Sequence, residues 1–248
     1  MKTFFTLALA LATATVMQAQ DYKVETFKTA SGKDVNITLI KHATLAIEYQ
    51  GYEIHVDAVA NYGAQPTDYS KFPKGDLILV THEHGDHFNI ETIESLMKPN
   101  SLLFMNQRCF DQMNKGMVLR NGDFRQITKD ISLKAVPAYN TTPDHLQFHP
   151  KGIGNGYVLN IDGLKNYIAG DTEDVPEMSN LKDEHIDVAF LPVNQPYTMT
   201  VDQAIRAAWM VQPKVLIPYH FSKTDVAPIK QRLEADLSGI EVRLRDMQ

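Results

Sequence analysis

Four side chains that can bind a metal ion fall within six residues of this sequence: His82, His84, Asp86 and His87. Imidazole nitrogens and carboxylate oxygens are common ligands of zinc, with bonds of roughly 2.0–2.2 Å. On an extended loop His82 and His84 project to the same side and can hold one ion, because side chains alternate along such a chain. Gly85 lets the chain turn, which would aim Asp86 and His87 at a second ion nearby. A solvated polar turn is the alternative, but packing hardly explains this density of ligands.

The pattern resembles the signature of the metallo-β-lactamase superfamily, which is His-x-His-x-Asp-His after a buried strand. The other metal-site positions of the superfamily recur in the same order along this chain. An aspartate that ends an earlier strand is matched by Asp57, and the aspartate of a Gly-Asp-Thr sequence by Asp171. The last histidine, after another apolar run, is matched by His220. The third histidine is matched by His149, with His145 as a rival slightly upstream.

The resemblance implies two divalent metal ions that share one carboxylate. The implied ligands, with Asp171 between the ions, are His82, His84 and His149 for one ion and Asp86, His87 and His220 for the other. Zinc suits this set best, and Mn²⁺ and Fe²⁺ accept similar ligands. A hydroxide bridging the ions would attack a carbonyl carbon or a phosphorus, which predicts a hydrolase of an ester, lactone or phosphoester. Asp86 and His220 are the expected catalytic residues, and Asp86 would also orient the nucleophile.

Two further residues are expected to support the ligands. Asp57 would orient a metal-bound histidine through a hydrogen bond. His42 begins the sequence His-Ala-Thr-Leu, which resembles the branch of the superfamily that includes ascorbate-6-phosphate lactonase. Ala-Tyr-Asn at 138–140, His-Pro-Lys-Gly at 149–152 and Tyr-Thr-Met at 197–199 resemble the same branch.

These branch motifs supply the candidate substrate-binding residues, which are Tyr139, Asn140, Lys151, Tyr197 and Thr198. The expected substrate is a small molecule, and a lysine beside the metals would suit an anionic one. Lys151 has an equal interpretation as a solvated loop charge. Tyr139 has an equal interpretation as a buried aromatic residue.

The hydrophobic pattern predicts the strands that position these residues. Alternation over 35–56, with Gln50-Gly51 as a turn, is typical of a β-meander with one buried face. The continuous apolar run 77–80 predicts a strand buried on both faces. Later strands are expected at 131–136, 156–161, 165–169, 187–191 and 214–217.

Three helices are expected between and after these strands. One starts at Asn89, runs through Met97 and is closed by Pro99; the others cover 201–211 and 227–237. Thr200 and Gln203 form a capping box for the second of them. The resemblance implies an α/β fold, a four-layer αβ/βα sandwich with the metals at one edge of the two sheets.

Residues 1–19 have the features of a secretory signal peptide, because one lysine precedes an uncharged apolar stretch. The stretch is too short to span a bilayer comfortably, so we expect no stable membrane insertion. The mature chain, 20–248, is then a single periplasmic or secreted domain. The formal charge of −6 lacks the basic footprint of a nucleic-acid-binding protein. The single cysteine, Cys109, excludes an internal disulfide.

Two other functions are compatible with the same residues. An exported zinc β-lactamase fits the His/Asp ligands and the signal peptide, although the Ala-Tyr-Asn and Tyr-Thr-Met motifs favour the lactonase-like branch. A non-catalytic binding protein that retains the fold is the second alternative. The complete ligand set argues against it.

Overall fold

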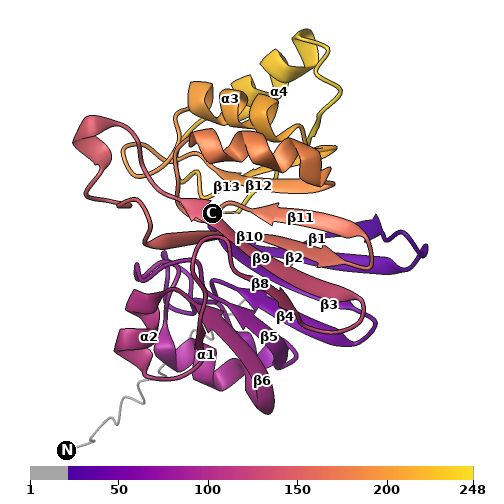
Figure 1. The fold of residues 1–248 in the computed structure, drawn as a ribbon, viewed down its shortest axis with the longest axis vertical. Coiled ribbons are helices and arrows are strands. Elements are labelled where there is room, and N and C mark those ends of the chain that lie inside the picture. The colour runs from indigo at the N-terminus through magenta and orange to yellow at the C-terminus, as the bar shows by residue number, and fades with distance from the viewer. Residues whose placement is uncertain (1–21, 248) are drawn as a thin grey trace, which may run out of the picture.

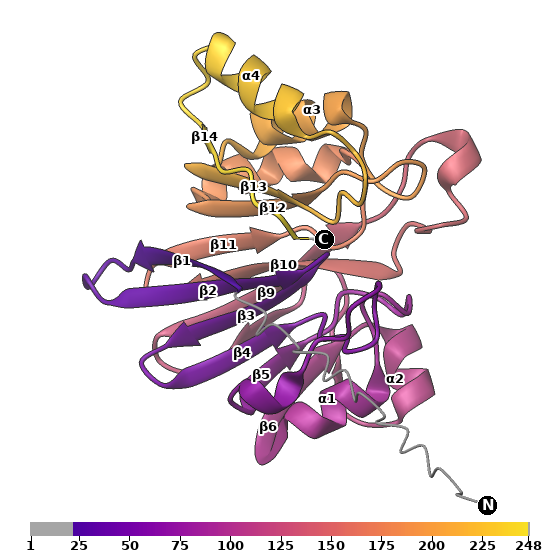
Figure 2. The same cartoon turned by 180° about the vertical axis from the view of Figure 1, so that it is seen from behind.

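Two seven-stranded mixed β-sheets form the centre of the molecule, and helices cover their outer faces (Figure 1, Figure 2). The computed structural model describes residues 22–247, so the predicted signal peptide lies outside the described residues. The first sheet has the order β1-β2-β3-β4-β5-β6-β7, with bounds β1 Lys23–Lys28, β2 Asp34–Lys41, β3 Thr44–Tyr49, β4 Tyr52–Val56, β5 Gly75–Leu79, β6 Met97–Met105 and β7 Met117–Val118. The second has the order β14-β13-β12-β11-β10-β9-β8, with bounds β8 Phe124–Gln126, β9 Ile131–Ala138, β10 Gly154–Ile161, β11 Leu164–Ile168, β12 Val188–Pro192, β13 Val215–Tyr219 and β14 Glu241–Val242.

Short helices complete the outer layers. Helices α1 (Ile90–Leu96) and α2 (Gln107–Met113) cover the first sheet, and α3 (Val201–Val211) and α4 (Ala227–Ala235) cover the second (Figure 1). Single 3-10 segments are η1 (Tyr69–Lys71), η2 (Pro143–His145) and η3 (Pro176–Glu184). The four layers confirm the predicted αβ/βα sandwich.

Burial of alternate strand residues holds the layers together. Val35 and Ile37 of β2 lie in the same fully buried cluster as Leu133 of β9 and Tyr157 of β10, which is the core between the sheets. A second cluster packs the helices of the second sheet against its outer face, and a third does so for the first sheet. Period-two alternation therefore builds the central layer, because one face of each strand must leave water.

Local turn and cap signals are confirmed. Gln50 and Gly51 have φ of 51° and 78°, the left-handed pair required by a tight turn between β3 and β4. Asp162 and Gly163 turn β10 into β11 in the same way, with φ of 48° and 85°. The reciprocal Thr200–Gln203 hydrogen bonds of the capping box are both present at the start of α3.

Two helix ends differ from the prediction. The helix that starts after Asn89 ends at Leu96, and Pro99 lies inside strand β6 instead of closing a helix. The pairing of β5 with β6 shifts register between Gly75 and Leu77, so Pro99 falls where no ladder hydrogen bond is required of it. Helix α4 ends at Ala235, two residues before the predicted end.

In the part of the chain that the structure describes, no helix has the length and apolar character needed to cross a membrane.

Candidate metal centre

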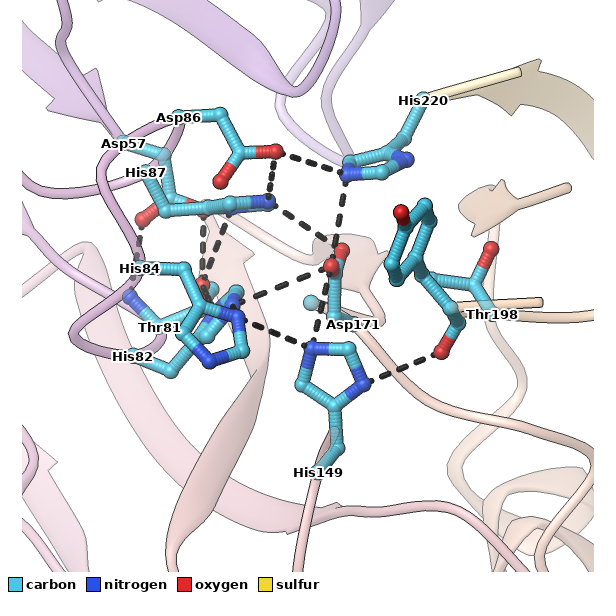
Figure 3. A network of polar contacts seen from close by, with 12 residues as sticks. Asp57, Thr81, His82, His84, Asp86, His87, His149, Asp171, Thr198 and His220 are labelled. Atoms are coloured by element: carbon cyan, nitrogen blue, oxygen red, sulfur yellow. Dashed lines mark hydrogen bonds and ion pairs between the residues drawn. The ribbon is translucent and has the colours of Figure 1, made fainter. Parts of the chain in front are cut away.

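The candidate ligands gather because their strands end at one edge of the sandwich. Strands β4 and β5 are parallel neighbours in the first sheet, and β11, β12 and β13 are parallel neighbours in the second. The carboxyl ends of parallel strands meet at the same edge, so Asp57, the 81–87 loop, Asp171 and His220 follow those ends. His149 reaches the same place from the loop that precedes β10. Figure 3 shows these side chains converging from both sheets.

The first ligand group consists of His82, His84, His149 and Asp171, whose donor atoms all lie within 4.8 Å of one another. His84 Nδ1 is 3.0 Å from His82 Nε2 and 3.2 Å from His149 Nε2. Asp171 Oδ2 is 3.2 Å from His149 Nε2 and 3.7 Å from His82 Nε2. Three imidazole nitrogens and a carboxylate oxygen therefore face a common point.

The second ligand group consists of His42, Asp86, His87 and His220, again within 4.8 Å. Asp86 Oδ2 is 3.3 Å from His220 Nε2 and 3.8 Å from His87 Nε2. Asp171 also reaches this group, because its Oδ1 is 3.2 Å from His87 Nε2 and its Oδ2 is 3.3 Å from His220 Nε2 (Figure 3). Asp171 thus lies between the two groups, where a shared ligand would have to be.

The donor atoms of both groups fit a cation better than they fit one another. His87 Nε2, Asp171 Oδ1 and His220 Nε2 are buried and have no hydrogen-bond partner among the described residues, although they lie close together. Buried polar atoms are rarely left without partners in native proteins. Neutral imidazole nitrogens and carboxylates are also the ligands that zinc, manganese and iron accept. A pair of divalent ions would satisfy these atoms.

Electrostatics keep the carboxylates charged. Although burial alone would raise the pKa of Asp171, the charges of His220 and His87 lower that pKa well below its usual range. Burial would lower the pKa of His220, but Asp171 outweighs it and raises the pKa to about 9. The Asp171 and Asp57 carboxylates raise the pKa of His87 in the same way. Metal binding must displace these protons, so it releases protons to solution.

Asp57 contacts His87 at Nδ1, the ring nitrogen that does not face the ligand group. Its carboxylate accepts hydrogen bonds from the Thr81 amide (2.8 Å) and hydroxyl (2.7 Å), and its Oδ2 lies 2.8 Å from His87 Nδ1. Both His87 and Asp57 are fully buried. Asp57 has a left-handed φ of 47°, which turns the chain sharply at the end of β4. This arrangement would let Asp57 orient His87, as the sequence predicts.

His42 lies within the second ligand group and contacts Asp86 directly. Its Nε2 is 3.1 Å from Asp86 Oδ2, and its ring lies 3.6 Å from that of His220, centroid to centroid. Burial lowers the pKa of His42 to about 4, so the ring is neutral and donates Nε2–H to Asp86. Tyr62, which the sequence pattern did not single out, also packs against this ring, with 4.3 Å between the ring centroids.

The two candidates for the third histidine, His149 and His145, make different contacts in the structure. His149 joins the first ligand group, and its Nδ1 lies 3.0 Å from the Tyr197 carbonyl oxygen. His145 lies beside Glu173, with 3.2 Å between Nδ1 and Oε1. Glu173 is fully buried and also accepts hydrogen bonds from the amides of Thr141 and Thr142, so it fixes the loop that carries both histidines. No spacing in the sequence indicated that role.

The His149→Ala variant is therefore expected to lose one ion of two, because it removes a ligand of the first group only. The His145→Ala variant is its matched control and should retain both ions. Elemental mass spectrometry of the two purified variants measures the difference. An ion lost from His145→Ala and retained in His149→Ala would reverse the assignment.

The predicted substrate-binding residues do not form one surface. The Lys151 ammonium binds the Tyr139 hydroxyl (3.1 Å) and Glu177 (3.0 Å), and its side chain is 66% exposed, so it is engaged in an ion pair on the surface. Asn140 is buried and donates to the Tyr197 carbonyl at 2.7 Å. Thr198 is fully buried and accepts from the Asn194 amide. Tyr197 alone among them is both exposed and bonded to a candidate ligand.

The fold and the paired His/Asp groups define a class of protein, and comparison with known proteins identifies it. The sequence profile of the beta-lactamase superfamily domain matches residues 36–220. A UPF0173 metal-dependent hydrolase of Ligilactobacillus salivarius is 31% identical over 202 residues, which are 79% of this chain and 89% of that protein.

Solved structures agree. A protein of Parabacteroides distasonis assigned as a metal-dependent hydrolase is 49% identical with a TM-score of 0.86, and the match covers 92% of this chain and 100% of that one. Igni18, a metallo hydrolase of Ignicoccus hospitalis, is 26% identical with a TM-score of 0.72, covering 86% and 95%. The chain belongs to the metallo-β-lactamase superfamily, among the relatives named metal-dependent hydrolases.

Proposed function

We propose that this metal-dependent hydrolase binds two divalent ions and cleaves an ester, lactone or phosphoester of a small molecule. The observation that carries the proposal is the position of Asp171, whose two carboxylate oxygens reach histidines of both ligand groups. Two divalent ions at such a site supply an activated water and stabilise the negative charge that develops on the substrate. Zinc suits the ligands best, and Mn²⁺ or Fe²⁺ would also be accepted.

The protein's own residues orient the reaction. Asp86 is 26% exposed, whereas the side chains of His87, Asp171 and His220 are at most 2% exposed, so Asp86 faces the side from which a substrate can approach. The contacts of Asp86 with His220 and His42, together with the charge of His87, outweigh burial and keep the pKa of Asp86 far below its usual range. Asp86 is therefore an ionised acceptor that can hold an attacking water by its proton. His220 Nε2 lies against both carboxylates and fixes their separation.

Metal content per chain tests the proposal first. The mature protein, residues 20–248, is dialysed without chelator and measured by elemental mass spectrometry; we expect about two equivalents. A protein that binds no metal even after addition of zinc or manganese contradicts the proposal and supports a non-catalytic binding protein.

Substrate screening with the loaded protein then separates the hydrolase classes. Chromogenic esters, lactones and phosphodiesters are compared with a chromogenic β-lactam, which reports on the exported β-lactamase alternative. His84→Ala should abolish whichever hydrolysis is found and reduce the bound metal at the same time. Full activity in that variant would contradict the assignment of the active site.

A further inference from the structure

A surface pocket of about 270 Å³ lies beside the loop that carries His82 and His84, because one of its lining residues, Arg108, pairs with Glu83. We call it the arginine pocket; it is lined mainly by Arg108, Leu119, Arg120, Asn121, Ile153 and Asn155. Arg108 belongs to helix α2; Leu119, Arg120 and Asn121 follow β7, and Ile153 and Asn155 lie just before and at the start of β10. None of the motifs considered in the sequence pointed to these residues.

Direct contacts join the arginine pocket to the first ligand group. Arg108 forms a 2.7 Å ion pair with Glu83, the residue between His82 and His84 in the sequence. The backbone N–H of Asn155 donates to the carbonyl of Thr81, the residue before His82, at 3.0 Å. The pocket therefore contacts the chain on both sides of the first candidate ligand.

The distance from the pocket to the candidate ligands is short enough for a small molecule to span. Gly152 also lines the pocket and follows His149 by three residues, so their Cα atoms are at most roughly 11 Å apart. Asn106 donates to both Glu83 (2.9 Å) and the Ile153 carbonyl (3.3 Å), which ties the pocket wall to the ligand loop. The separation between the pocket and the first ligand group is therefore within the length of a small molecule.

The lining favours an anion. Two arginines and no carboxylate residue line this pocket, in a chain whose formal charge is −6. Arg108 is already paired with Glu83. The Arg120 guanidinium forms no ion pair with any residue in 22–247. A guanidinium binds a carboxylate or phosphate through two parallel hydrogen bonds, which a lysine cannot do.

The floor of the arginine pocket is rigid and partly apolar. Asn121 Nδ2 donates to Asn155 Oδ1 at 2.7 Å, and Asn155 Nδ2 donates to the Leu119 carbonyl at 2.9 Å. Leu119 is almost fully buried and Ile153 half-buried, so the wall between the polar groups is hydrocarbon. Such a site suits a short apolar stretch that ends in an anionic group.

We propose that the arginine pocket binds a carboxylate or phosphate group of the substrate whose scissile bond lies at the metal centre. The inference rests on the proposed function, because only a hydrolytic centre makes the bound molecule a substrate. Arg120 is the primary anchor, since Glu83 already engages Arg108.

Calorimetric titration of the metal-loaded protein tests the pocket with three probes: glutarate, methyl phosphate and the neutral glutaramide. Arg120→Gln should weaken glutarate or methyl phosphate binding about tenfold or more, because it removes a charge-assisted pair, and should leave glutaramide unchanged. Whichever anion shows the larger loss identifies the group that the pocket takes. Arg125→Gln is the matched control, because Arg125 is an exposed arginine of β8 outside the pocket, and it should match wild type.

The same samples are analysed for metal, so that the two proposals fail separately. Two bound ions together with equal affinities of wild type and Arg120→Gln for both anions would overturn the pocket and leave the hydrolase proposal standing. Anion binding that depends on Arg120 in a protein unable to hold metal would overturn the hydrolase proposal, and with it the role of the pocket as a substrate anchor.

Discussion

The Asp171→Ala variant is expected to lose both metal ions, because the Asp171 carboxylate lies between the two ligand groups. Its Oδ2 is 3.2 Å from His149 Nε2 of the first group, and its Oδ1 is 3.2 Å from His87 Nε2 of the second. An ion present at about 1,000 times its dissociation constant stabilises the fold by about 4 kcal/mol. For a chain of this size, losing one such ion lowers the melting temperature by roughly 8–16 °C, and losing both lowers it by roughly 16–32 °C.

Elemental analysis and thermal unfolding, each with and without chelator, measure both effects. Chelator should lower the melting temperature of the wild type toward that of the variant and should not change the variant further. Asp187→Ala is the control. Asp187 directly precedes β12, at the amino end of the strand and away from the edge that carries the ligands, and it binds Lys214 at 2.7 Å. A variant of Asp171 that still carries two ions would show that the groups do not share this carboxylate.

The positions that form the candidate metal centre could be predicted from the sequence, because most of them follow strands directly. Asp57 comes one residue after β4 and His220 one residue after β13, and each strand has its own apolar signal. Once parallel strands are inferred, their ends must meet at one edge, and the ligand positions follow. The sequence alone does not decide between His149 and His145, because both lie on a loop without periodicity. Tertiary contacts decide instead: His149 contacts His84 and Asp171, whereas His145 contacts Glu173.

Residues held by distant partners could not be predicted in this way. Lys151 was a candidate anion-binding group, but Glu177, in a 3-10 segment that sequence pattern did not mark, binds its ammonium. Tyr62 reaches His42 from an irregular loop, and Arg120 faces the arginine pocket from a turn. Irregular segments carry no hydrophobic period, so their side-chain positions depend on tertiary contacts alone.

Edge strands were missed for a related reason. Strand β1 is mostly exposed, and β8 is exposed along its full length, so neither shows the alternation that marked β2 to β4. Their main-chain hydrogen bonds to the neighbouring strand hold them in place instead. Hydrophobic patterning predicts strands that bury one face, but it does not detect exposed strands at the edge of a sheet.

The Asp57→Asn variant is expected to bind metal about 10- to 100-fold more weakly although it removes no ligand. A carboxylate only accepts hydrogen bonds, so its contact with His87 places the proton on Nδ1 and leaves the Nε2 lone pair facing the second ligand group. Asparagine offers one accepting oxygen where Asp57 uses two, since Oδ1 accepts the Thr81 amide and Oδ2 faces His87. The amide NH₂ must then oppose one of these donors.

If the NH₂ faces His87, the imidazole must move its proton to Nε2, where it blocks the metal. If it faces Thr81, the loop that carries His82 loses the hydrogen bond that anchors its first residue. Competition with a chelating indicator measures the affinity of each ion, and we expect the second group to be affected most. Glu25→Gln is the matched control, because Glu25 is also a buried carboxylate but binds Arg243 and Arg245. That variant should lose stability and keep wild-type metal affinity, whereas equal affinities in all three proteins would show that Asp57 serves packing and does not set the proton on His87.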